Sequence, residues 1–173
     1  MLKFQKKHLL GALIFLVIAV AVVAAIVASG KDSTPKPKSS NQKAAVTGCG
    51  PYRKDGVVSI NGKTISVETA AGQQELTKGL SGRPCIESNW GMLFDFGHDG
   101  QYAIWMKDMK FPIDVAWINS AHKVVALEID FKPSTYPDKR VNQTPARYVL
   151  EMPANKSKEL SIYIGTSVHF YKS

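Results

Sequence analysis

Twenty consecutive uncharged residues near the N-terminus, Leu9 to Ala28, limit how this chain can fold. As an α-helix with a rise of about 1.5 Å per residue, they would extend for roughly 30 Å, the thickness of the hydrocarbon core of a bilayer. A cleaved signal peptide is the alternative, but its apolar core is usually about 7–15 residues long. The sequence therefore predicts a transmembrane helix at 9–28 that acts as an uncleaved signal-anchor.

Three lysines that precede this span indicate its orientation. Lys3, Lys6 and Lys7 lie in the first eight residues, and positively charged flanks of membrane helices stay in the cytoplasm. We therefore expect a cytoplasmic head at 1–8 in a single-pass protein of the cell membrane. Residues 29–48 are rich in Pro, Ser and Lys, which is typical of a flexible linker. The folded, extracytoplasmic domain is expected at 49–173.

The formal net charge of +8 is concentrated near the predicted membrane helix. The chain has 22 basic and 14 acidic residues, and residues 1–48 contain seven of the lysines against one aspartate. Residues 49–173 therefore hold 15 basic and 13 acidic residues, a net charge of +2. A basic segment beside a membrane favours contact with anionic lipid or wall polymer. The nearly balanced domain lacks the electrostatic footprint of a nucleic-acid-binding protein, so we expect no nucleic-acid partner.

The two cysteines, Cys49 and Cys85, both lie in the part of the chain that we expect outside the cell. Disulfides persist in that environment, so the sequence predicts a bridge, with two free buried thiols as the alternative. The bridge would close a loop of about 37 residues and stabilise the domain by roughly 4 kcal/mol.

Short apolar segments separated by turn residues predict a mainly β domain. The sequence VVSINGKTISVET alternates around Asn61-Gly62, a pair typical of a two-residue hairpin turn. Such a hairpin would pair 57–60 with 64–69. Further strands are expected at 90–96, around Trp105, and at 113–118, 124–129, 147–152 and 167–172, with short helices at 71–80 and 153–160 and a long loop at 131–146. About seven strands and two small helices indicate a sandwich or a partly closed barrel.

Four segments of the chain resemble the domain of unknown function 192 family in their order and spacing. They are TKGLSGR, WGMLFDF, IWMKDMKFPIDVAWI and ARYVLEMPAN. The resemblance covers residues 57–170 and implies a mainly β, jelly-roll-like sandwich, often secreted or membrane-anchored, without a settled activity. The chain departs from the family pattern at Ser81-Gly82, where a bulky pair is usual, and at Asp108-Met109, where Asn-Thr is usual. The matching positions are Gly79, Leu80, Arg83, Gly91, Met92, Phe94, Trp105, Met106, Lys107, Pro112, Asp114, Leu150, Glu151 and Pro153.

The segment QYAIWMKDMKFPIDVAWIN places charged residues between two apolar strands. Residues 108–112 could join these strands as a hairpin, with Lys107 and Asp114 at its mouth. We therefore predict a polar pocket walled by an aromatic ring, suited to a sugar or another polar ligand. Its candidate ligand-binding residues are Arg83, Trp105, Lys107, Asp108, Asp114 and Glu151. Turn capping or a buried structural network is the alternative role for these charges.

The sequence favours a non-catalytic binding module at the cell envelope, for a carbohydrate or a wall component. There are two alternatives: an envelope hydrolase that uses carboxylates, or a structural partner of a membrane complex. The sequence contains no nucleophile motif that would indicate an enzyme, and we assign no catalytic residue. The spacing of Asp95, His98 and Asp99 matches neither a zinc nor an EF-hand signature. We therefore expect no metal and no cofactor. The oligomeric state is left open.

Overall fold

The computed structural model describes residues 46–173. Within that range no helix is long and apolar enough to cross a membrane. The predicted cytoplasmic head, the transmembrane helix at 9–28 and most of the predicted linker lie outside the described residues.

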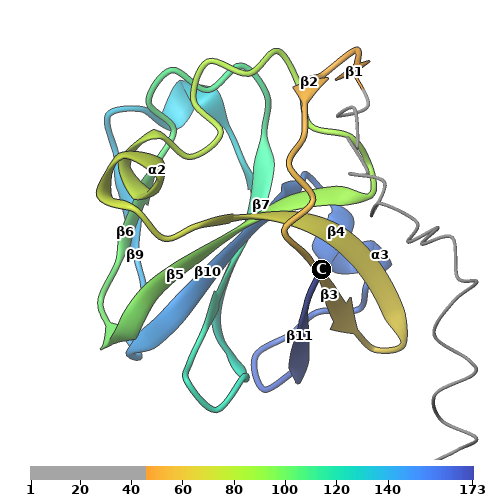
Figure 1. The fold of residues 1–173 in the computed structure, drawn as a ribbon. Coiled ribbons are helices and arrows are strands. Elements are labelled where there is room, and N and C mark those ends of the chain that lie inside the picture. The colour runs from red at the N-terminus through yellow and green to blue at the C-terminus, as the bar shows by residue number, and fades with distance from the viewer. Residues whose placement is uncertain (1–45) are drawn as a thin grey trace, which may run out of the picture. The chain divides into compact units, whose positions relative to one another are not determined.

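The described strands form one seven-stranded sheet and two small two-stranded sheets (Figure 1). The order in the large sheet is β11-β3-β4-β5-β10-β7-β8, and the small sheets pair β1 with β2 and β6 with β9. The strands span Val46–Thr47 (β1), Gly50–Pro51 (β2), Gly56–Ile60 (β3), Lys63–Ala70 (β4), Trp90–Gly100 (β5), Ala103–Trp105 (β6), Ile113–Ile118 (β7), Val124–Phe131 (β8), Lys139–Val141 (β9), Ala146–Pro153 (β10) and Val168–Lys172 (β11). The helical elements are α2 (Gln73–Lys78), the 3-10 turn η1 (Pro133–Thr135) and α3 (Lys156–Glu159).

The mainly β domain with two short α-helices is confirmed, but the sheet does not close into a barrel. An isolated bridge between Lys123 and Ser167 brings the two edges of the sheet together at one end only. The expected sandwich would need two sheets of similar size, whereas most of the described strands belong to a single sheet. The large sheet is curled (Figure 1). Its buried apolar side chains form two clusters, and Ile104 of β6 and Leu76 of α2 pack in the second of them.

The predicted hairpin at the Asn61-Gly62 turn is confirmed. Strands β3 and β4 are antiparallel, with Ile60 opposite Lys63. Asn61 and Gly62 have φ angles of 50° and 76°, which is the left-handed conformation that a type I′ turn requires at both central positions. Asparagine and glycine adopt this conformation more readily than other residues, so this local pair defines the strand register.

The connection between β4 and β5 determines where the cavities of the domain lie. These two neighbouring strands are parallel, and parallel neighbours need a long crossover because a tight turn reverses the chain and makes the next strand antiparallel. Residues 71–89 form that crossover and include the predicted helix, α2, which ends at Lys78 with Gly79 as its C-cap. None of the α2 residues is buried, so the helix lies on the surface of the domain.

Alternating side chains of the central strands point to opposite faces of the sheet. In β10, Leu150 and Met152 belong to one buried apolar cluster, whereas Val149 belongs to the other. Glu151 lies on the same face as Val149 and opposite Met92 of β5 and Val115 of β7. A carboxyl group is therefore placed in a layer that is otherwise apolar.

The hairpin predicted at 108–112 is wrong. Strand β6 pairs with β9 and not with β7. Strand β7 already has β10 on one side and β8 on the other, so neither of its edges is free to bind β6. Residues 106–112 form an irregular connection in which Asp108 has a φ of 57°.

The predicted disulfide is confirmed: Cys49 and Cys85 are bridged, with their Cα atoms 4.8 Å apart. The bridge ties the segment before β3 to the end of the crossover between β4 and β5. Residues of both segments line the larger cavity.

Candidate functional site

The larger pocket is a cavity of about 540 Å³ between the disulfide-linked segment, the end of β4 and the crossover. Charged side chains from all three parts reach it, namely Arg53, Glu68, Glu75, Lys78 and Arg83. Three of these are basic and two are acidic, so the lining is slightly positive and rich in hydrogen-bond donors. No cluster of three or more His, Cys, Asp or Glu side chains within residues 46–173 could hold a metal ion.

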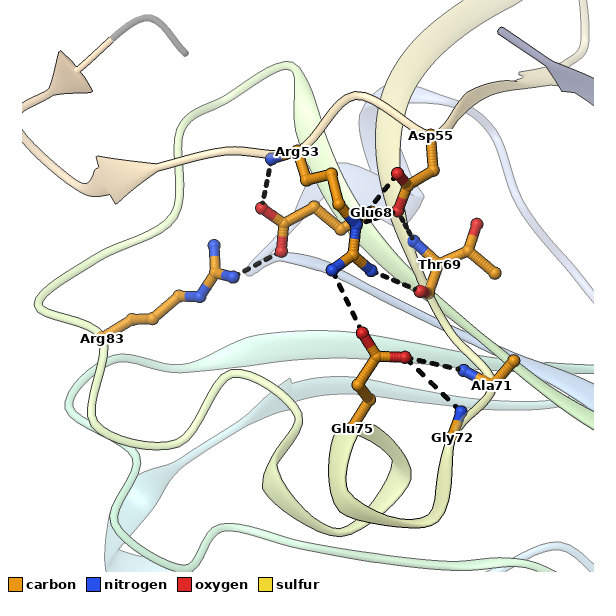
Figure 2. A network of polar contacts seen from close by, with 8 residues as sticks. All are labelled: Arg53, Asp55, Glu68, Thr69, Ala71, Gly72, Glu75 and Arg83. Atoms are coloured by element: carbon orange, nitrogen blue, oxygen red, sulfur yellow. Dashed lines mark hydrogen bonds and ion pairs between the residues drawn. The ribbon is translucent and has the colours of Figure 1, made fainter.

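Glu68 and Arg83 form a partly buried ion pair at the wall of the larger pocket (Figure 2). Glu68 is 5% exposed, and its carboxylate accepts hydrogen bonds from Arg83 Nη2 and from the backbone N–H of Arg53, the latter at 2.7 Å. The Arg83 guanidinium also lies 5.4 Å from the centre of the Tyr52 ring. Its Nη1 atom is buried and has no hydrogen-bond partner among residues 46–173.

Arg53 fixes a second side of the larger pocket (Figure 2). Its guanidinium donates to the Asp55 carboxylate at 2.7 Å and to the carbonyl oxygen of Thr69 at 2.8 Å, and it lies 3.1 Å from the Glu75 carboxylate. Glu75 also accepts from the backbone N–H groups of Ala71 and Gly72 at the start of α2. Arg53 thereby links the N-terminal segment to β4 and α2 and leaves fewer of its donors for a ligand than Arg83 does.

A second and much smaller space, which we name the Glu151 cavity, lies on the other side of Gly79. It has a volume of about 40 Å³ and is lined by Glu151, Trp105, Thr77, Lys78, Gly79, Ser81 and the apolar side chains Leu76, Leu80, Phe94, Ala103, Ile104 and Met109. Glu151 is 6% exposed. No hydrogen bond or ion pair joins its carboxyl group to another described residue.

Burial raises the pKa of Glu151 from 4.5 to about 8, because the apolar surroundings disfavour the charged form and no cation compensates for it. Below about pH 4.5 the group is protonated in both the folded and the unfolded chain. Between about 4.5 and 8 only the unfolded chain ionises, so the folded state loses stability as the pH rises through this window.

We therefore expect Glu151→Gln to be more stable than the wild type by about 3 kcal/mol at pH 7. The amide is neutral in both states, so its unfolded chain is not favoured by ionisation as the unfolded wild type is. The difference should shrink towards zero below about pH 4. Denaturant unfolding across the pH range measures it. Glu128→Gln, which removes a half-exposed carboxylate paired with Arg140, is the control and should show no such gain. A destabilised Glu151→Gln at pH 7 would mean that the carboxyl group is ionised and bound in the folded state.

The structure separates the residues that the sequence grouped into one pocket. Arg83 lines the larger pocket, and Trp105 and Glu151 line the Glu151 cavity. Lys107 lies 5.7 Å from the centre of the Trp105 ring, and both Lys107 and Asp108 are exposed. The Trp105 ring therefore forms a rim, 36% exposed, and not a buried wall.

Asp114 is the clearest correction. It is completely buried, on the face of β7 opposite to Glu151, and lines neither cavity. Its carboxylate accepts from the backbone N–H groups of Asp130, Asn155 and Ser157 and from the Ser157 hydroxyl. It forms no ion pair with Lys107 or with any other described residue, so the joint site predicted for Lys107 and Asp114 is wrong.

Sequence reasoning missed Glu68 and Arg53. Both lie in the larger pocket and contact each other through the Arg53 backbone N–H. The available signal was an acidic residue next to buried Val67 in β4, which is unusual in a strand. It could not be interpreted without knowing that both faces of this strand are covered.

Fold and cavities together define a mainly β domain with one large curled sheet and two cavities that share Gly79 in their lining. Residues 56–170 match the DUF192 family, described as "Uncharacterized ACR", and the chain belongs to this family. The predicted resemblance is thus confirmed.

Two solved structures have the same fold. A protein from Sinorhizobium meliloti described as a "putative transcription regulator" is 27% identical, with a TM-score of 0.61 over 66% of this chain and 90% of that one. A protein of unknown function from Novosphingobium aromaticivorans is 23% identical, with a TM-score of 0.60 over 66% of this chain and 81% of that one. Comparison with functionally curated proteins found no match.

Proposed function

We propose that the domain is a non-catalytic binding module at the cell envelope, and that its ligand is a polar, acceptor-rich molecule such as a carbohydrate or wall component. The observation that carries this proposal is the buried Nη1 of Arg83 at the larger pocket, which has no partner among the described residues. Buried donors are nearly always paired, so a donor without a partner beside a cavity favours a ligand oxygen as its missing acceptor.

The dimensions of the larger pocket agree with this role. Its volume of about 540 Å³ lies within the range of about 300–1,000 Å³ typical of small-molecule sites. Arginine binds carboxylate and paired hydroxyl oxygens through its planar fork, and Glu68 holds that fork from the other side. Residues 49–173 carry a net charge of only +2, so they lack the strongly basic surface that nucleic-acid binding requires. The description of the Sinorhizobium protein as a regulator is therefore not extended to this chain.

Replacing Arg83 with lysine tests the proposal. Lysine can still pair with Glu68 but has no second donor in a fixed plane, so binding should fall at least about 10-fold while the fold persists. The measurement is an array of glycans and wall fragments, followed by titration of the best ligand with residues 43–173, which form one compact unit.

The matched control is Arg147→Lys, in the Arg147–Asp95 pair, which lines neither of the two cavities described above. This variant should bind as the wild type does. Equal affinities of the wild type and Arg83→Lys would show that the larger pocket is not the binding site.

Anchoring through Leu9 to Ala28 is the second part of the proposal and is supported by the length and lack of charge of that segment. Three lysines before it favour a cytoplasmic N-terminus and an external domain. Protease added to intact cells should then remove a C-terminal tag, and a tag that is protected until lysis would contradict this orientation.

A further inference from the structure

The Glu151 cavity contains a carboxyl group without a partner. Glu151 projects from the middle of β10 into an apolar layer, where its strand neighbours Met92 and Val115 offer no charge. It is 94% buried, and no hydrogen bond or ion pair joins its carboxyl to another described residue. Since an uncompensated buried carboxyl destabilises the folded state, a role in binding would account for its presence.

The surroundings of this carboxyl define what could bind there. The space of about 40 Å³ holds one or two water-sized groups. Leu76, Leu80, Phe94 and Ile104 supply apolar walls, and Trp105 lies at the rim. A carboxylate accepts hydrogen bonds but cannot donate them. The combination suits a small cationic donor carried on an apolar stem.

Gly79 keeps the carboxyl accessible. A Cβ atom at this position would lie 3.1 Å from the Phe94 ring and 3.8 Å from Glu151 Oε2, and the backbone φ of 49° also favours glycine. Any larger residue would therefore crowd the Phe94 ring beside the carboxyl group. Gly79, Lys78 and Ser81 line both cavities.

We propose that the Glu151 cavity binds a primary ammonium group at the end of an alkyl chain, with the Glu151 carboxylate as its counter-ion and the apolar walls around its stem. The inference does not depend on the larger pocket and stands even if that pocket binds nothing. The nearby cations Lys78, Lys107 and Lys139 are exposed, so solvent screens their repulsion of an incoming ammonium group. The acidic groups Glu75 on α2 and Asp108 beyond β6 are exposed too, and Glu75 is paired with Arg53.

Binding of the cation should release a proton. The empty site holds Glu151 in its neutral form at pH 7, because its pKa is about 8, and an alkylammonium group remains charged to about pH 10. When the ammonium ion enters, the carboxyl proton leaves for the buffer. An acid with a pKa of about 8 is about 1% ionised at pH 6 and half ionised at pH 8, so the apparent affinity should rise about 50-fold between these values.

Calorimetric titration of the full chain, purified in mild detergent, with butylammonium tests this inference. We expect binding that strengthens from pH 6 to pH 8 and a heat that changes with the ionisation enthalpy of the buffer, which reports the released proton. Butanol, the neutral analogue of the probe, should bind at least about 10-fold more weakly. Glu151→Gln should lose binding to a similar extent, whereas Glu128→Gln should not.

Three outcomes would overturn the inference. The first is that butylammonium does not bind at millimolar concentrations, which would leave water as the occupant. The others are that butanol binds as tightly as butylammonium, or that Glu151→Gln binds butylammonium as the wild type does.

Titration with an Nα-acetyl-lysine amide distinguishes the source of the ammonium group. Binding of this compound as tight as that of butylammonium supports a lysine-like side chain of a peptide as the source, and its exclusion supports a free alkylamine.

Discussion

Replacing Asp114 with alanine should lower the free energy of unfolding by about 4 kcal/mol. Its buried carboxylate accepts from the backbone N–H groups of Asp130, Asn155 and Ser157 at 2.9, 3.0 and 2.9 Å. Each buried donor that loses its partner costs about 1–3 kcal/mol. Asp130 and Asn155 have φ angles of 55° and 67°, so the carboxylate also fixes two residues in the left-handed conformation, which is uncommon for a non-glycine residue.

The measurement is denaturant unfolding, with Asp99→Ala as the matched control. Asp99 also accepts from one backbone N–H and one hydroxyl group, both of Ser120, but it is exposed. Water can replace it, so its loss should cost about 1 kcal/mol or less. Asp114→Asn, which keeps one acceptor oxygen, should fall between the two. Equal small effects at Asp114 and Asp99 would contradict the structural role assigned to Asp114.

Removing the disulfide with the pair of substitutions Cys49→Ser and Cys85→Ser should have a similar effect, a loss of about 4 kcal/mol. The two cysteines are 36 positions apart, and a cross-link of that length restricts the unfolded chain by about this amount in the chain-entropy model. The segment before β3 would then be held to the domain by non-covalent contacts alone, among them the hydrogen bonds of Arg53 to Glu68 and Thr69 and the stacking of Tyr52 on Trp90.

Unfolding of the wild type with and without a thiol reductant, compared with the double serine variant, measures this contribution. The reduced wild type should match the variant, and the variant should not respond to the reductant. A wild type whose stability is the same in both conditions would show that the bridge does not constrain the unfolded chain. Binding to the larger pocket should weaken in parallel, because Cys49 forms part of its wall.

Much of the fold follows from local sequence patterns. The Asn61-Gly62 turn, the helix capped by Gly79 and the apolar strands at 90–96 and 147–152 all lie where the sequence predicts them. These features depend on residues that are close in the chain, such as the φ preference of glycine and asparagine and the two-residue period of strands. The disulfide followed from there being only two cysteines, both expected outside the cell.

The candidate site depends on contacts between segments far apart in the chain, which is why the sequence grouped residues into one pocket that the structure separates. Lys107 and Asp114 are near neighbours in sequence, but β10 and β8 occupy both edges of β7, and Asp114 turns inward to bind backbone groups from positions 130, 155 and 157.

By itself the sequence determined the local elements, the cysteine pair, the family and the apolar segment at 9–28. Only the tertiary structure decided that Arg83 pairs with Glu68 and that Glu151 is left without a partner. The physical reason is that the parallel pairing of β4 and β5 requires a long crossover. That crossover carries Arg83 to Glu68 and Gly79 over Glu151, and no pattern of neighbouring residues encodes where it comes to rest.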